Sequence, residues 1–229
     1  MFIGHFGVGF AAKRVAPRLS LGTAFLAAQW VDLAWPTFLL LGWETVRIQP
    51  GATAVTPLVF EHYPWTHSLV GAVGWGVVLG AVYGLLRKDA RNAIVVGLLV
   101  VSHWLLDALV HAPDLPLTPG GAARVGLGLW NSVPATLAVE VPIFALGAWL
   151  YARCTWSQLD RTGRWAFGGL VAFLVLIHAA NLLGSPPPSA TAIAWVGQAQ
   201  WLLVAWGYWV ESRVGRGRRL SAGGAPRIA

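Results

Sequence analysis

Six long apolar runs constrain this chain more than any other feature of its sequence. Each run holds roughly 17–25 residues, the length that an α-helix needs to cross the hydrocarbon core of a bilayer. The mean hydropathy is +0.62 and only 11% of the residues are charged, whereas a soluble protein carries about a quarter charged residues. We therefore predict an all-α, polytopic membrane bundle whose six transmembrane helices lie at about residues 19–43, 65–86, 92–111, 135–151, 165–184 and 190–210.

The predicted helices account for nearly the whole chain, so we expect one integral-membrane domain over residues 1–212. Residues 213–229 form a basic tail that could touch anionic lipid headgroups through Arg213, Arg216, Arg218 and Arg219. The apolar stretch 2–12 is too short to span a bilayer. We expect it to form a short N-terminal helix, either on the inner membrane surface or as a half-length helix inside the membrane.

Basic residues set the predicted orientation. The segments 13–18, 87–91, 153–164 and 211–229 hold 14 of the 16 Lys and Arg residues, and the intervening loops hold only Arg47 and Arg124. Alternation across six helices then places these basic segments and the C-terminus in the cytoplasm. This pattern explains the net charge of +7 as an orientation signal, so we predict no nucleic-acid partner.

Three ionisable side chains lie close together in the third predicted helix. His103, Asp107 and His111 are four residues apart, so they share one helix face over about 12 Å of its length. Ionisable groups at membrane depth are costly and usually functional. Two imidazoles with a carboxylate between them indicate a metal site or a proton relay.

Ionisable residues of three other predicted helices fall at a similar depth. At about 1.5 Å per residue, Asp32 lies about 10 Å below the outer face, Glu140 about 8 Å and His67 about 3 Å. A divalent cation would explain this convergence, because imidazole nitrogen and carboxylate oxygen suit zinc, manganese or iron. Without a cation the acids would be protonated or paired across the bundle, so a proton relay and a purely structural network remain alternatives.

Short motifs in the first half of the chain resemble a known family. The segment His62–Ser68 has the outline of His-Arg-Gly-aromatic-Thr-His-Ser, with Tyr63-Pro64 in place of Arg-Gly. Together with Gly4-His5, the acid Asp32 and the later Ser102-His103-x-x-x-Asp107, it resembles the membrane-bound metal-dependent hydrolases. That family includes the LexA-regulated inner-membrane hydrolases of bacteria and is similar to zinc-dependent phospholipase C in its order of His and Asp ligands.

The resemblance covers roughly residues 1–115 and implies a bacterial inner-membrane, multi-pass protein with a divalent metal, zinc first and manganese or iron as alternatives. The residues that fall on presumed metal-binding positions are His5, Asp32, His67, His103 and Asp107. The sequence has one acid where the family commonly shows Asp-x-Asp-His, so His111 and Glu140 are candidates for substitute ligands or for the general base. The implied reaction is hydrolysis of a phosphoester or similar bond of a lipid-like substrate near the outer leaflet.

Two non-hydrolytic functions remain open. The chain could be an integral subunit of a larger membrane complex or a homo-oligomer, since small residues such as Gly74, Gly80 and Gly84 would allow close helix approach. It could also conduct protons or ions, although few polar residues fall in the inner half. The single cysteine, Cys154, excludes an intrachain disulfide and a Cys-rich metal site.

Overall fold

The computed structural model describes residues 1–215, and most of them are helical. Four helices are long and apolar enough to cross a membrane, α5 (Leu69–Arg87), α6 (Ala90–Val110), α7 (Val133–Thr155) and α8 (Arg161–Leu183). Each begins at a residue whose side chain accepts a first-turn backbone N–H, namely Ser68, Asp89, Ser132 and Asp160. These helices confirm the predicted class, a helical bundle of membrane-protein character.

The predicted first and sixth spans are each interrupted. The first is present as α2 (Leu21–Ala28) followed by α3 (Trp30–Leu40), and the sixth as α9 (Ala190–Gln198) followed by α10 (Gln200–Glu211). One residue, Gln29 or Ala199, separates the members of each pair. Since neither pair forms one helix of spanning length, the six-span topology stays a prediction.

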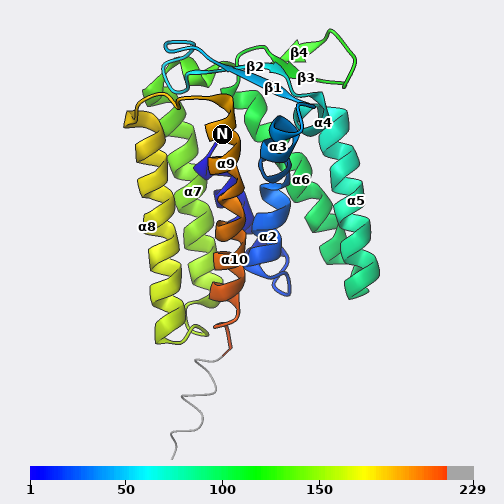
Figure 1. Ribbon diagram of the computed structural model, residues 1–229. Helices are drawn as coiled ribbons and strands as arrows, with labels where there is room; N and C mark the ends of the chain where they lie inside the picture. Colours follow the sequence, from blue (N-terminus) through cyan, green and yellow to red (C-terminus); the bar gives the residue numbers. More distant parts are fainter. Residues whose placement is uncertain (216–229) are drawn as a thin grey trace, which may run out of the picture.

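The two interrupted segments pack against each other, α2 on α10 and α3 on α9 (Figure 1). Glycines permit the close approach. A Cβ on Gly207 would lie 3.1 Å from the Cα of Gly22, and a Cβ on Gly197 would lie 2.5 Å from the ring of Pro36. The pairing therefore fixes α3, which carries Asp32, within the bundle.

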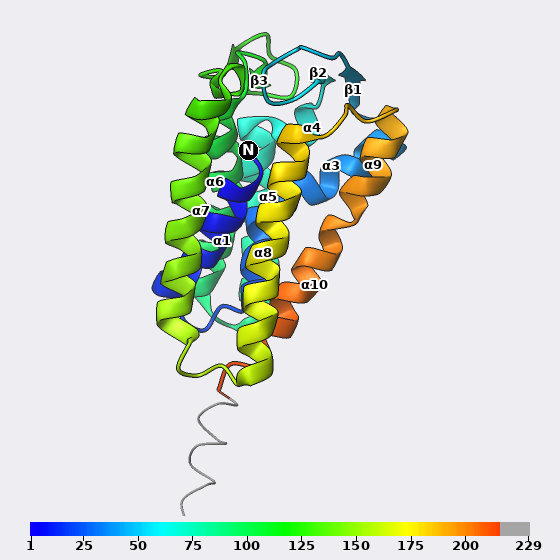
Figure 2. The same cartoon turned by 90° about the vertical axis from the view of Figure 1, so that its left-hand side faces the viewer.

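Helix α1 (Ile3–Val15) lies inside the bundle, between the longer helices (Figure 2). Its Phe6 and Phe10 side chains have no exposed surface. It meets α7 at a glycine contact, where a Cβ on Gly7 would lie 2.7 Å from the Cα of Phe144. Of the two positions expected for this segment, the structure thus favours a half-length helix within the bundle.

A cap of short elements covers one end of the helices (Figure 1). Strand β1 (Thr45–Ile48) pairs antiparallel with β2 (Leu58–His62), with Val46 opposite Phe60, and β3 (Leu115–Pro116) pairs antiparallel with β4 (Arg124–Val125). The cap also contains the short helix α4 (Pro64–His67) and the 3₁₀ turn η1 (Leu129–Asn131). These two hairpins are absent from the prediction, which treats the segments 44–64 and 112–134 as loops.

The opposite end of the bundle gathers basic residues. The joins α1–α2, α5–α6 and α7–α8 lie at this end, as does the end of α10 (Figure 1). Lys13 pairs there with Glu211, which also accepts from the Tyr151 hydroxyl at 3.1 Å. This agrees with the predicted alternation of the chain. Arg213 lies 3.8 Å from Asp160, while Arg216, Arg218, Arg219 and the rest of the predicted tail lie outside the described residues.

The row of small residues proposed for partner helices is largely used within the chain. A Cβ on Gly80 would lie 2.8 Å from the carbonyl oxygen of Ala93, and one on Gly84 would lie 3.2 Å from the Ala93 Cβ. Both glycines therefore serve the packing of α5 on α6. Only Gly74 of the three has open space at its Cβ position.

Candidate metal centre

The five residues predicted to bind metal come together from four elements. His5 lies on α1, Asp32 on α3, His67 at the end of α4, and His103 and Asp107 on α6. They form two groups, His5 with His103 and Asp107, and Asp32 with His67 and His103, each with potential ligand atoms within 4.8 Å of one another. His103 belongs to both groups, so the five side chains make one continuous cluster that could hold a metal ion.

Two imidazole nitrogens of this cluster each lie close to two carboxylate oxygens. His103 Nε2 lies 3.2 Å from Asp107 Oδ2 and 3.6 Å from Asp32 Oδ1. His67 Nε2 lies 3.4 Å from Asp32 Oδ1 and 3.9 Å from Asp107 Oδ2. Ligand atoms about 2.0–2.1 Å from a tetrahedral zinc ion lie about 3.3 Å apart. Two imidazole nitrogens and two carboxylate oxygens are thus close to coordination geometry.

The interruption between α2 and α3 orients His103. Ala28 is the last residue of α2, and the carbonyls of a final helical turn need partners outside the helix. The Ala28 carbonyl lies 2.8 Å from His103 Nδ1. Because a carbonyl only accepts, His103 carries a proton on Nδ1, so Nε2, which faces Asp32 and Asp107, is the nitrogen that a metal ion could use.

His67 is oriented by a chain of polar groups that sequence reasoning missed. Its Nδ1 lies 2.7 Å from the Thr66 hydroxyl, which donates to Glu44 Oε2 at 2.7 Å. The other oxygen of Glu44 accepts from the backbone N–H groups of Trp65 and Thr66, at 2.8 and 2.9 Å. Glu44 is 22 residues from Thr66, just before β1, so no spacing in the sequence connects it to His67.

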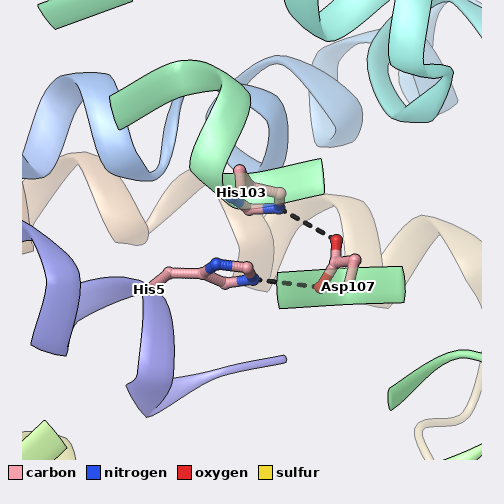
Figure 3. Close-up of side chains that lie close together, drawn as sticks. All are labelled: His5, His103 and Asp107. Carbon is pink, nitrogen blue, oxygen red and sulfur yellow. Dashed lines mark hydrogen bonds and ion pairs between the residues drawn. The ribbon is translucent and has the colours of Figure 1, made fainter. Parts of the chain in front are cut away.

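His5 completes the cluster from the opposite side (Figure 3). Its ring lies parallel to that of His103, with 3.6 Å between the ring centroids and 5° between the planes. Its Nε2 lies 3.1 Å from Asp107 Oδ1, an oxygen that also accepts from the Met1 amino group at 2.5 Å. Asp107 therefore uses one oxygen toward α1 and the other toward His103 and His67.

Asp32 is the most accessible member of the cluster. Its side chain is 23% exposed, whereas those of His5, His67, His103 and Asp107 are 3% exposed or less. The cap lies over the site, and the Trp104 indole of α6 donates to the Pro116 carbonyl of β3 at 3.2 Å. A ligand would thus reach the cluster at Asp32, on the side of α3.

His111 lies beside the cluster but is absent from both groups of potential ligands found among residues 1–215. Its ring centroid is 6.4 Å from that of His67, and its Nδ1 lies 3.1 Å from Asp114 Oδ1. The same oxygen accepts from the Tyr63 hydroxyl at 3.0 Å. Burial, and then the negative charge of Asp114, raise the pKa of Tyr63, so this phenol stays a neutral donor.

Glu140 contacts the start of α1. Its Oε2 accepts from the backbone N–H groups of Phe2 and Gly4, at 2.9 and 3.4 Å. A carboxylate that satisfies the first N–H groups of a helix stabilises that helix end. Glu140 therefore anchors α1 to α7, and in the described residues it does not join the potential metal ligands.

Comparisons with protein-family models, with curated proteins and with solved structures gave no match to this chain.

Proposed function

We propose that this protein is a metal-dependent hydrolase that cleaves a phosphoester or similar bond of a lipid-like substrate near the outer leaflet. We further propose that it resides in a bacterial inner membrane with its C-terminus in the cytoplasm. The observation that carries the proposal is the arrangement of Asp32, His67, His103 and Asp107, in which each of the two imidazole Nε2 atoms lies 3.2–3.9 Å from an oxygen of each carboxylate.

The chemistry of the donor set supports a divalent cation. Two carboxylates buried beside imidazoles and surrounded by apolar helices gain most from a positive ion at their centre. Both ligand histidines have Nδ1 facing another polar atom, so their Nε2 atoms are available. Imidazole nitrogen and carboxylate oxygen ligands suit zinc, and manganese or iron are the alternatives.

The surroundings supply a general base. A bound divalent cation would lower the pKa of a water molecule and polarise the scissile bond. His111 donates from Nδ1 to Asp114, which leaves its Nε2 able to take a proton from that water. Asp114 holds the imidazole in this tautomer, while Tyr63 keeps Asp114 in place.

The position of the cluster favours a substrate with a lipid tail. Four of the five ligands lie on α1, α3 and α6, and the accessible one, Asp32, lies on α3. A lipid headgroup could then approach between helices while its tails stay among apolar side chains. The motifs around His67 and Asp107, which resemble those of the membrane-bound metal-dependent hydrolases, point to the same reaction class.

Metal content tests the proposal directly. Purified wild-type protein in detergent should carry about one zinc equivalent per chain by elemental analysis. Asp107→Asn is nearly isosteric but removes the ligand charge, so it should lose the metal and the release of phosphate or headgroup from phospholipid micelles. Asp160→Asn is the matched control, because Asp160 caps α8 far from the cluster and asparagine caps equally well.

Wild-type protein that remains metal-free after incubation with zinc, manganese and iron would contradict the proposal. The chain would then be better explained as an integral subunit of a membrane complex. If the wild type binds metal and both Asp107→Asn and Asp160→Asn retain it, Asp107 is not a ligand.

A further inference from the structure

We propose that Glu44 is a positioning residue which, through the Thr66 hydroxyl, fixes His67 in the tautomer that can bind metal. This inference rests on the proposed metal centre, but its first consequence, the proton position on His67, is measurable without metal. Glu44, Thr66 and His67 are 1%, 0% and 3% exposed. Their hydrogen bonds are therefore isolated from competing water.

The first step is the direction of the hydrogen bond between Thr66 and Glu44. A carboxylate offers only acceptors, and Glu44 Oε1 already accepts two backbone N–H groups. Its Oε2 lies 2.7 Å from the Thr66 hydroxyl, so the single proton of that hydroxyl points to Glu44. Glu44 thereby sets the direction of the hydrogen bonds that run from His67 through Thr66 to Glu44.

The second step is the tautomer of His67. Once the Thr66 hydroxyl has used its proton, it can only accept from His67 Nδ1, which lies 2.7 Å away. The imidazole proton is then on Nδ1. His67 Nε2, which faces Asp32 Oδ1 and Asp107 Oδ2, is then the nitrogen that a metal ion could use.

The third step is a contrast with His103. That ring reaches the same tautomer through the backbone carbonyl of Ala28, which no side-chain substitution reverses. The direction of the hydrogen bond at His67 Nδ1 depends on the side chains of Thr66 and Glu44, so a substitution can reverse it. The structure therefore offers an internal reference, His103, for any change seen at His67.

Glu44→Gln should reverse the direction of these hydrogen bonds. The glutamine oxygen can still accept the backbone N–H groups of Trp65 and Thr66, which turns its amide N–H₂ toward the Thr66 hydroxyl. That hydroxyl must then donate to His67 Nδ1, and the imidazole proton moves to Nε2. We expect zinc affinity to fall by about 10–100-fold, the usual effect of losing a partner of a metal ligand.

Two substitutions at Thr66 serve as controls. Thr66→Ser keeps the hydroxyl and should bind zinc within about threefold of wild type, whereas Thr66→Val keeps the shape and should resemble Glu44→Gln. Zinc affinity is measured by competition with a chromogenic chelator. The tautomers of His67 and His103 are measured by ¹⁵N NMR of the imidazoles in metal-free protein, with assignment from a His67→Asn variant.

The expected result is the loss of the Nδ1 proton at His67 alone, with weaker zinc binding in Glu44→Gln and Thr66→Val. Unchanged ¹⁵N shifts at His67 in Glu44→Gln would overturn the inference. The inference would also be overturned if all variants bound zinc equally well while metal-free Glu44→Gln unfolded at a lower temperature. Glu44 would then only cap α4. A shifted tautomer in a protein that binds no zinc would sustain the positioning role and contradict the proposed function.

Discussion

Asp114 links the cap to His111 through one carboxylate oxygen. That oxygen accepts from both Tyr63 and His111, while the backbone carbonyl of Asp114 accepts from Arg124 of β4 at 2.8 Å. Tyr63 itself has no exposed surface. The orientation of the proposed general base thus depends on a phenol that must remain protonated.

This dependence predicts a loss of stability at high pH. Because Tyr63 has a raised pKa in the folded protein, its extra stability is complete below the ordinary value of 10.0 and is lost as the pH rises above it. Tyr63→Phe removes the titrating group and one hydrogen bond, at a cost of about 1 kcal/mol near neutral pH.

Thermal unfolding of the two proteins measures this effect. Between about pH 9 and pH 11.5 the midpoint of wild type should fall more steeply than that of Tyr63→Phe. Parallel curves over this range would show that the Tyr63 phenol does not contribute to the pH dependence of folding.

Among the helices, α1 and α7 have the closest backbone contact that bears on the site. A Cβ on Gly147 would overlap the backbone of Gly7, two residues after His5 in the chain. Glu140 on α7 caps the start of the same helix. Helix α7 contributes no ligand to the cluster, but it determines where His5 lies.

Gly147→Ala should therefore weaken both the fold and the site. Overlap with backbone cannot be relieved by a rotamer change, so we expect a destabilisation of about 1–3 kcal/mol and a lower zinc affinity. Gly168→Ala on α8 is the matched control. Its Cβ would meet nothing within 4 Å, and the better helix propensity of alanine should stabilise the protein by up to about 1 kcal/mol.

Denaturant or thermal unfolding, together with the chelator competition, distinguishes these variants. Equal stability of Gly147→Ala and Gly168→Ala would mean that α1 and α7 do not approach as closely as described.

The helices also show which features a sequence can predict. Apolar run length is sufficient for α5 to α8, because a spanning helix needs little beyond hydrophobic residues. The interruption at Gln29 has no such signal, since neither Gly nor Pro lies there, and Pro36 lies inside α3. The break results from tertiary contacts, among them the bond from His103 to the Ala28 carbonyl.

For the molecule as a whole, the depth calculated from the position of each residue along its predicted helix placed Asp32, His67, His103 and Asp107 near one another. It worked because rise per residue along a helix is nearly constant. The same arithmetic placed Glu140 at the right depth but could not give its direction, which is toward α1. Glu44 and Asp114 were missed because they lie in the cap, where position along the chain does not translate into depth.

Orientation in the membrane is testable with single cysteines. In a Cys154→Ser background, Ala54→Cys in the β1–β2 loop and Arg161→Cys at the start of α8 are both exposed and lie at opposite ends of the bundle. The basic segments predict that Arg161 is cytoplasmic. A membrane-impermeant maleimide should label Ala54→Cys in intact cells, and Arg161→Cys only after permeabilisation. The reverse pattern would place the proposed site in the inner leaflet.

The contact between α1 and α7 also constrains how this protein can be synthesised. All five residues of the cluster are made by the time residue 107 leaves the ribosome, yet the helix that holds α1 spans residues 133–155. Contacts between such distant parts of a chain form late. During translation the nascent chain therefore passes through a stage in which α1 can pack on α2 and α6 but lacks α7, the helix that anchors its start, so the proposed metal centre would be completed only after α7 is made.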